Sequence, residues 1–244
     1  MVKRILSAIL GLLLVAVPLW ANDGGCMDTI ETSAGDLQIS FIGHGTLMFA
    51  FDGKIIHVDP WSKLADYAKL PKADLILITH EHQDHLDLAA VELLTKPGTQ
   101  MVASRPAAVH LPGSLVMQNG ESKTVQGLAI EAVPAYNLVH MRSEGVPFHP
   151  KGNGNGYVVT FGGTRVLVAG DTENTPELKG LQGVDVAFLP MNLPYTMTPE
   201  MVADAALALQ PKILYPYHFG ETDTARILDL LAGSGIDVRI RAMQ

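Results

Sequence analysis

The sequence predicts an α/β fold in which two mixed β-sheets pack face to face and helices cover their outer sides. The chain has 244 residues, of which 48% are hydrophobic and 17% charged, a composition that supports a sizeable core. Short β-like runs form meanders in each half of the chain, and helical runs fall in the gaps between them. Periodicity alone would fit other α/β arrangements, so the choice also depends on the motifs that follow the strands.

In the first half, an Asp52-Gly53 turn joins two of the predicted strands as a hairpin. The apolar run 74–79 predicts a short strand that ends at a cluster of histidines, and the next segment, 85–94, predicts a helix. The other strands predicted here are 37–42, 47–51, 54–58 and 100–103.

In the second half, a long polar loop, 137–155, interrupts the regular pattern, and such a loop in a folded domain is more often functional than idle. A helix is predicted at 198–209 with Thr198 as its N-cap, and another at 222–231. The strands predicted here are 129–133, 157–161, 165–169, 184–189, 213–217 and 238–240.

The N-terminus has the pattern of a secretion signal. Lys3 and Arg4 precede an almost entirely apolar run, and Ala21 is a small residue suited to cleavage. We therefore expect a signal peptide at 1–21, one folded domain at 22–244, and export to the periplasm or the extracellular space. A retained membrane anchor is the alternative, although the run is short for a span, and a lipid-modified Cys26 is a third possibility.

The predicted mature chain is acidic. Loss of Lys3 and Arg4 with the signal leaves 15 basic and 25 acidic residues, which changes the formal charge from −8 to −10. That charge and the absence of a Lys/Arg cluster disfavour nucleic-acid binding. We expect a small-molecule substrate and no stable membrane insertion after cleavage, while the oligomeric state stays open. The single cysteine allows no internal disulfide.

The segment His80-Glu81-His82-Gln83-Asp84-His85 predicts a metal site. Side chains at i and i+2 of an extended backbone point the same way, so His80 and His82 can share one metal ion. A turn into the following helix can then direct Asp84 and His85 toward a second position. Imidazoles with a carboxylate suit Zn²⁺, and Mn²⁺ or Fe is possible where oxygen ligands are added.

With these motifs the sequence resembles the metallo-β-lactamase superfamily. The match comprises His80-x-His82-x-Asp84-His85, then Asp171 in Ala-Gly-Asp-Thr and His218 in Pro-Tyr-His-Phe-Gly, each after a predicted strand. Gly43-His44-Gly45-Thr46 and Val58-Asp59-Pro60 match the opening hairpins, so the resemblance covers about 37–220. It implies an αββα sandwich, and it is strongest to the predicted Zn-dependent hydrolases that include ascorbate-6-phosphate lactonase-like proteins.

The resemblance also implies a ligand set for two metals. Asp171 matches the carboxylate that bridges both ions, and His218 matches the last ligand of the second. The third histidine of the first ion is open, because Asn137 stands where that histidine is expected. Of two candidates, His149 is preferred over His140, since its flanking prolines would hold it stiffly.

Four other residues near these motifs have separate expectations. His44 either contacts substrate or is structural. His57 alternates with apolar neighbours in a strand and is expected to be structural, whereas His110 is expected at the surface. Asp59 is expected to accept the free N–H of a ligand imidazole, or else to be a simple turn residue.

These expectations combine into a metal-dependent hydrolase. Two ions would share a bridging hydroxide that attacks a lactone, ester, amide or phosphoester, with Asp84 positioning the second ion and handling a proton. Two alternatives remain: an iron-type redox protein, and a non-catalytic metal-binding protein of the same fold.

Overall fold

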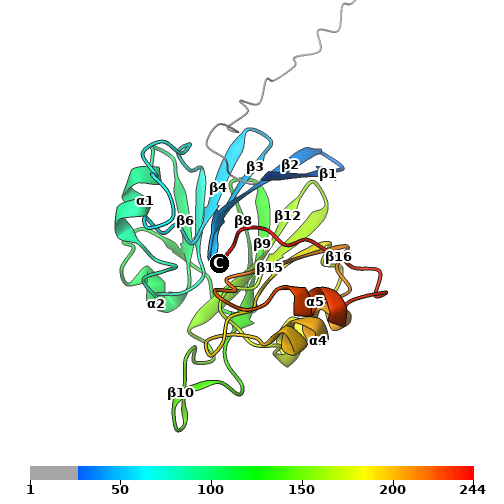
Figure 1. Cartoon of the computed structure of the whole chain (residues 1–244). Helices are drawn as coiled ribbons and strands as arrows, with labels where there is room; N and C mark the ends of the chain where they lie inside the picture. The colour runs from blue at the N-terminus through cyan, green and yellow to red at the C-terminus, as the bar shows by residue number, and fades with distance from the viewer. Residues whose placement is uncertain (1–26) are drawn as a thin grey trace, which may run out of the picture.

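Two seven-stranded sheets face each other in the computed structural model, which describes residues 27–244 (Figure 1). The first sheet follows the order of the chain. Its first four strands pair antiparallel and its last four, from β4 on, pair parallel. They are β1 (Met27–Thr32), β2 (Gly35–Gly43), β3 (Thr46–Phe51), β4 (Lys54–Val58), β5 (Leu75–Ile78), β6 (Gln100–Ala103) and β7 (Leu115–Val116).

The second sheet has the order β16-β15-β14-β13-β12-β9-β8. Its strands from β13 to β16 are parallel, and β8, β9, β12 and β13 pair antiparallel. They are β8 (Ser122–Val125), β9 (Leu128–Ala135), β12 (Gly154–Phe161), β13 (Thr164–Val168), β14 (Val186–Pro190), β15 (Ile213–Tyr217) and β16 (Asp237–Val238), and a separate hairpin is formed by β10 (Met141–Ser143) and β11 (Val146–Pro147). Both sheets are mixed, as predicted.

Helices cover the outer sides of the sandwich. In Figure 1, α1 and α2 lie beside the first sheet, and α4 and α5 lie on the opposite side of the molecule, below the second. The helices are α1 (Leu88–Leu94), α2 (Arg105–Ala108), α3 (Pro176–Lys179), α4 (Pro199–Leu209) and α5 (Ala225–Leu230). The predicted α/β sandwich with outer helices is therefore confirmed.

The main core lies between the sheets. Phe49 of β3 contacts Phe161 and Phe188 of the second sheet, with ring centroids 5.5 and 6.1 Å apart. Strand β5 is buried on both faces, because Leu75 and Leu77 belong to this core while Ile76 and Ile78 pack in a second cluster with α1 and α2. Burial on both faces explains why this parallel strand is continuously apolar rather than alternating.

Two local predictions are confirmed and one is wrong. The Asp52-Gly53 turn joins β3 to β4 with φ of 48° and 71°, as a type I′ hairpin requires. Thr198 caps α4 by accepting the N–H of Met201 at 3.1 Å. The helix predicted from 85 begins only at Leu88, because the Asp87 carboxylate caps it and the residues before it form a turn.

The expectations for 1–21 and for Cys26 concern residues outside those described. Within residues 27–244, no helix has both the length and the apolar character needed to cross a membrane.

Candidate metal centre

The candidate ligands meet because strand ends from both sheets converge. In parallel α/β sheets, ligands bind beyond the carboxyl ends of the strands. His44 directly follows β2, Asp59 follows β4, His80 comes two residues after β5, Asp171 three residues after β13, and His218 directly follows β15. Residues far apart in sequence are thereby brought to one edge of the sandwich.

The first group consists of His80, His82 and His149, which each offer an imidazole nitrogen within 4.8 Å of the others. Nε2 of His80 lies 3.0 Å from Nδ1 of His82. His149 enters from the segment after β11. Asn137 fixes it, since Oδ1 of Asn137 lies 2.7 Å from the backbone N and 2.9 Å from Nδ1 of His149.

His140 is held elsewhere. Its Nδ1 lies 2.7 Å from Oε1 of Glu173, and within residues 27–244 it belongs to no cluster suited to a metal. Of the two candidates for the third histidine, the structure therefore brings only His149 to His80 and His82.

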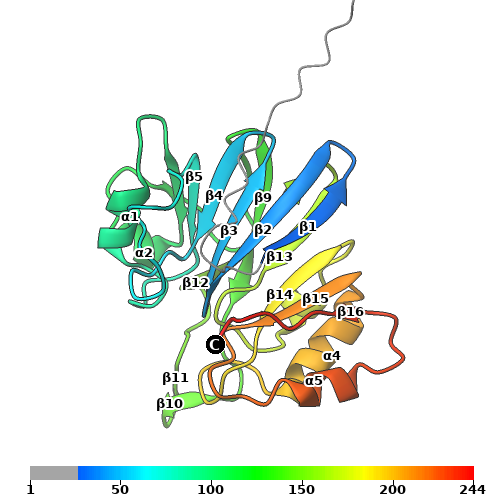
Figure 2. The same ribbon diagram turned by 45° about the horizontal axis from the view of Figure 1, so that its top comes forward.

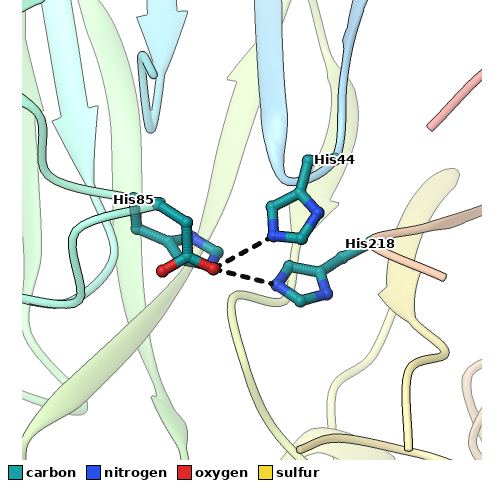
Figure 3. Close-up of side chains that lie close together, drawn as sticks. His44, His85 and His218 are labelled. Atoms are coloured by element: carbon teal, nitrogen blue, oxygen red, sulfur yellow. Dashed lines mark hydrogen bonds and ion pairs between the residues drawn. The ribbon is translucent and has the colours of Figure 1, made fainter. Parts of the chain in front are cut away.

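The second group consists of His44, Asp84, His85 and His218. Oδ2 of Asp84 lies 3.0 Å from Nε2 of His44 and 3.7 Å from Nε2 of both His85 and His218. Figure 3 shows the three imidazoles grouped around one carboxylate, with dashed lines to His44 and His218. His44, whose role the sequence left open, is thus a member of this group and directly contacts Asp84.

Asp171 lies between the two groups. Its Oδ1 is 3.4 Å from Nε2 of His85, and its Oδ2 is 3.3 Å from Nε2 of His149 and 3.5 Å from Nε2 of His218. Nε2 of His80 is 3.9 Å away. One buried carboxylate therefore faces imidazole nitrogens of both groups.

Asp59 orients His85 from behind. This fully buried carboxylate accepts from the backbone N–H and the hydroxyl of Thr79 at 2.8 and 2.6 Å, and lies 2.8 Å from Nδ1 of His85. Nε2 of His85 is thereby turned toward Asp171. The position matches the expectation that Asp59 would accept the free N–H of a candidate ligand.

The charges around the centre keep its carboxylates ionised, as metal ligands must be. Burial of His85 is outweighed by the same carboxylates, which raise its pKa and favour its protonated form. Burial opposes ionisation of Asp171, but the charges of His218 and His85 hold its pKa well below the ordinary value. The pKa of Asp84 is likewise lowered, because imidazoles of His218 and His44 outweigh its burial. Burial lowers the pKa of His80, which favours its neutral form.

Three of the six non-glycine residues with positive φ in 27–244 lie at the centre. His44, Asp59 and His218 have φ of 50°, 45° and 48°, in the left-handed region that residues with a side chain seldom adopt. Gly45 leaves room for an imidazole, since a Cβ there would lie 2.8 Å from Cε1 of His85. Such strain persists only where the surroundings enforce it, and it is common at functional sites.

The residues present fit metal ions. Several buried atoms that face the centre have no hydrogen-bond partner in the described chain: Nε2 of His85, Nε2 of His218 and Oδ1 of Asp171. A buried polar atom without a partner is costly. Imidazole nitrogen with carboxylate oxygen is a donor set that Zn²⁺ and related ions take, and a bound cation would relieve this cost.

Sequence reasoning missed Glu173. Its buried carboxylate accepts the backbone N–H groups of Leu138, Val139 and His140, each at 2.7 Å, and the Asn137 amide at 3.0 Å. It thus anchors the loop that supports His149. In the sequence, what pointed to Glu173 was its position two residues after Asp171, in the segment that follows a predicted strand.

A cavity of about 410 Å³ opens onto the centre. Its lining is His44, His82, Gln83, Asp84, Arg142, Phe148, His149, Asp171, Asn192, Tyr195 and His218. A larger hollow of about 1040 Å³ lies at the other edge, beside the β3–β4 turn, but its described lining contains no histidine. Its lysines include Lys54 and Lys96, which pair with Asp52 and Asp74. Candidate ligands of both groups therefore line the smaller cavity.

His57 and His110 stand apart from the centre. His57 is buried, with its Nε2 3.1 Å from the carbonyl oxygen of Pro71, whereas His110 is exposed. Both placements agree with the sequence expectations.

The chain is similar to proteins of known family. A family profile described as the β-lactamase superfamily domain matches residues 38–218. A UPF0173 metal-dependent hydrolase of Methanopyrus kandleri is 31% identical over 84% of this chain and 95% of its own length.

Two solved structures resemble the fold. The crystal structure of a protein from Parabacteroides distasonis, described as a metal-dependent hydrolase, has 48% identity and a TM-score of 0.87, covering 90% of this chain and all of its own. Igni18, a metallo hydrolase from Ignicoccus hospitalis, has 26% identity and a TM-score of 0.69, covering 84% of this chain and 94% of its own.

Proposed function

Because the chain belongs to the β-lactamase superfamily and, within it, to the UPF0173 metal-dependent hydrolases, we propose that it hydrolyses a small molecule at a two-metal centre. The superfamily predicted from the histidine motif is thereby confirmed. The closer affinity to ascorbate-6-phosphate lactonase-like proteins stays a prediction.

The position of Asp171 supports two ions rather than one. Its two oxygens face imidazoles of both groups at 3.3 to 3.5 Å. We assign His80, His82 and His149 to the first ion, and Asp84, His85 and His218 to the second, with Asp171 shared. His44 holds Asp84 in place through its 3.0 Å contact.

Bound metal would lower the pKa of a shared water toward neutrality, giving a bridging hydroxide, and would polarise the oxygen that gains charge in the reaction. The protein supplies the remaining parts. The lowered pKa of Asp84 keeps its carboxylate ionised, as a ligand of the second ion must be. Because Asp84 is also partly exposed to the cavity, we assign it the handling of a proton there. Phe148 and Tyr195 pack edge to face and supply the aromatic part of the cavity lining.

Zn²⁺ is the proposed metal, since five of the seven proposed ligands are imidazoles, and Mn²⁺ or Fe is the alternative. The proposed substrate is a lactone, ester, amide or phosphoester. Export also remains a proposal, based on the apolar run after Lys3 and Arg4. Cell fractionation of the full chain and of a chain lacking 1–21 would test it, and an unchanged distribution would contradict export.

The test of function is a hydrolysis screen. Purified protein is reconstituted with Zn²⁺, Mn²⁺ or Fe²⁺ and assayed on lactone, β-lactam, amide and phosphodiester substrates. We expect metal-dependent turnover of at least one class, reduced about 100-fold or more in Asp84→Ala. Asp66→Asn is the matched control, because that exposed carboxylate pairs with Lys69, accepts the N–H of Ala68 and does not line the cavity.

Turnover that persists in Asp84→Ala would remove Asp84 from the mechanism. Absence of turnover on every class and with every metal would contradict the hydrolase proposal. Oxygen consumption by the Fe²⁺ form alone would favour the redox alternative.

A further inference from the structure

We propose that Arg142 binds an anionic group of the substrate, so that the enzyme prefers small molecules with a carboxylate or phosphate attached to an apolar portion. This inference rests on the proposed function, because it concerns the same cavity. It adds the class of substrate, which the metal centre alone does not select.

Arg142 reaches the cavity from a hairpin that is tied to the metal centre. Strands β10 and β11 pair antiparallel with Met141 opposite Pro147, and the hairpin projects from the sandwich (Figures 1 and 2). The chain then continues directly into Phe148 and His149. The side chain of Arg142 is therefore placed at the cavity by the same segment that positions a proposed ligand.

In the described part of the chain, the charge of Arg142 is not paired with a carboxylate. Among residues 27–244 no carboxylate forms an ion pair with its guanidinium, and its recorded contact is with the Phe148 ring at 5.7 Å. By contrast, Arg165 pairs with Glu131 at 2.6 Å and Arg226 with Glu200 at 3.0 Å. A guanidinium over an aromatic ring keeps the N–H groups at its edge free for a planar or tetrahedral anion.

Within the described lining of the cavity, Arg142 is the one side chain with a permanent positive charge. The two carboxylates there, Asp84 and Asp171, are both engaged by imidazoles. Within this cavity an anionic group of the substrate is therefore attracted to Arg142. The volume of about 410 Å³ suits a small molecule with two such ends.

Two aromatic rings, which we call the aromatic wall, line the same cavity as Arg142 and several of the candidate ligands. Phe148 meets Tyr195 edge to face with ring centroids 5.0 Å apart, and Tyr195 is 45% exposed. The carbonyl of Tyr195 accepts the Asn137 amide at 2.9 Å, which joins this wall to the support of His149. An apolar portion of the substrate lying on these rings would carry its charge to Arg142 and its reacting group to the metals.

The test compares probes that share a metal-binding head. Benzohydroxamic acids with a para carboxylate, phosphonate or carboxamide are titrated calorimetrically into the metal-loaded full chain. We expect the carboxylate or the phosphonate to bind about five- to tenfold more tightly than the carboxamide, the range for a solvent-accessible charge contact. Tighter binding of the carboxylate probe would indicate that the substrate carries a carboxylate, and tighter binding of the phosphonate probe would indicate a phosphate.

In Arg142→Gln the preference should disappear while the carboxamide affinity stays unchanged, and Arg142→Lys should retain part of it. Raising the salt from 0.05 to 0.5 M should reduce the preference in the wild type only. Arg105→Gln is the matched control, because it removes the same charge from an exposed position on α2 that does not line the cavity. It should behave as the wild type.

Equal affinity for all three probes in the wild type would overturn the proposal. So would a preference that survives in Arg142→Gln, or failure of every probe to bind. Because binding needs no turnover, this outcome is independent of the hydrolase assay. A preference for the anionic probes without any hydrolysis would support the anion site and contradict the proposed reaction. Hydrolysis without that preference would support the reaction and contradict the anion site.

Discussion

Replacing Asp59 by asparagine should weaken metal binding at a residue that is not itself a proposed ligand. The buried carboxylate accepts two hydrogen bonds from Thr79 and lies 2.8 Å from Nδ1 of His85. Asparagine keeps the shape but has one acceptor oxygen and one amide donor group. At least one of the donors now facing Asp59 would therefore meet the N–H₂ group instead of an acceptor.

The size of the effect follows from the contact that is lost. A hydrogen bond to a charged group contributes about 1.5–3 kcal/mol. Since 1.4 kcal/mol corresponds to a factor of ten, this predicts a roughly ten- to hundredfold weaker affinity for the ion held by His85, in the range found for residues that support metal ligands. The first ion should be less affected, because Asp59 reaches its ligand His80 only through the Thr79 hydroxyl, which lies 3.0 Å from Nδ1 of His80.

The assay is a competitive zinc titration against a chromophoric chelator at constant pH, which resolves two affinities per chain. Asp74→Asn is the control, since that carboxylate also accepts a backbone N–H, from Ile55 at 2.8 Å, but lies away from the centre. Circular dichroism verifies that both variants are folded. Two affinities within about twofold of the wild type in Asp59→Asn would refute the reasoning, because the predicted loss is tenfold or more.

Three further predictions concern the same structure. Asn137→Ala removes the acceptor beside Nδ1 of His149 and should weaken the first ion about tenfold, whereas Asn174→Ala at the surface should not; equal affinities in the two variants would contradict the support assigned to Asn137. Burial of His85 opposes its protonation, but Asp171 and Asp59 raise its pKa to about 10 in the metal-free chain, so metal must displace a proton there. Affinity for the second ion should therefore rise by up to about tenfold per pH unit between roughly pH 6.5 and 9, and a flat profile would exclude that proton. Burial lowers the pKa of His57 to about 4, and its Nδ1 has no partner in the described chain, so folding stability should be complete above pH 6.5 and fall as the pH drops toward 4. This loss of folding stability, up to about 3 kcal/mol by linkage, should be absent in His57→Leu. Denaturation curves measured across this pH range would contradict the prediction if the wild type and His57→Leu lost stability in parallel.

The sequence predicted the site best where the candidate ligands lie close together in the chain and follow a recognisable strand. The histidine cluster lies within six residues, after a continuously apolar strand, so both its chemistry and its place at a strand end could be inferred. Asp171 and His218 follow later strands and were linked to the cluster only through the superfamily resemblance. Their meeting depends on the facing of two sheets, which no local pattern encodes.

What the sequence did not predict depends on long-range contacts. Strand β1 alternates polar residues at an exposed edge, and Asp28 within it pairs with Arg241 from the far end of the chain at 2.7 Å. Glu173 acts through hydrogen bonds to residues more than thirty positions earlier in the chain, and Asn137 through hydrogen bonds to His149, twelve positions later. The late start of α1 arises because the N–H groups of His85 and Leu86 both bond to the carbonyl of His82, which orients the candidate ligands at the cost of helix length.

The measurement that tests the central claim most directly is the metal content of the folded chain. Purified protein is saturated with Zn²⁺, desalted and analysed by inductively coupled plasma mass spectrometry against its measured concentration. The placement of Asp171 between two groups of ligands predicts two ions per chain. One ion, or none, would contradict the two-metal centre.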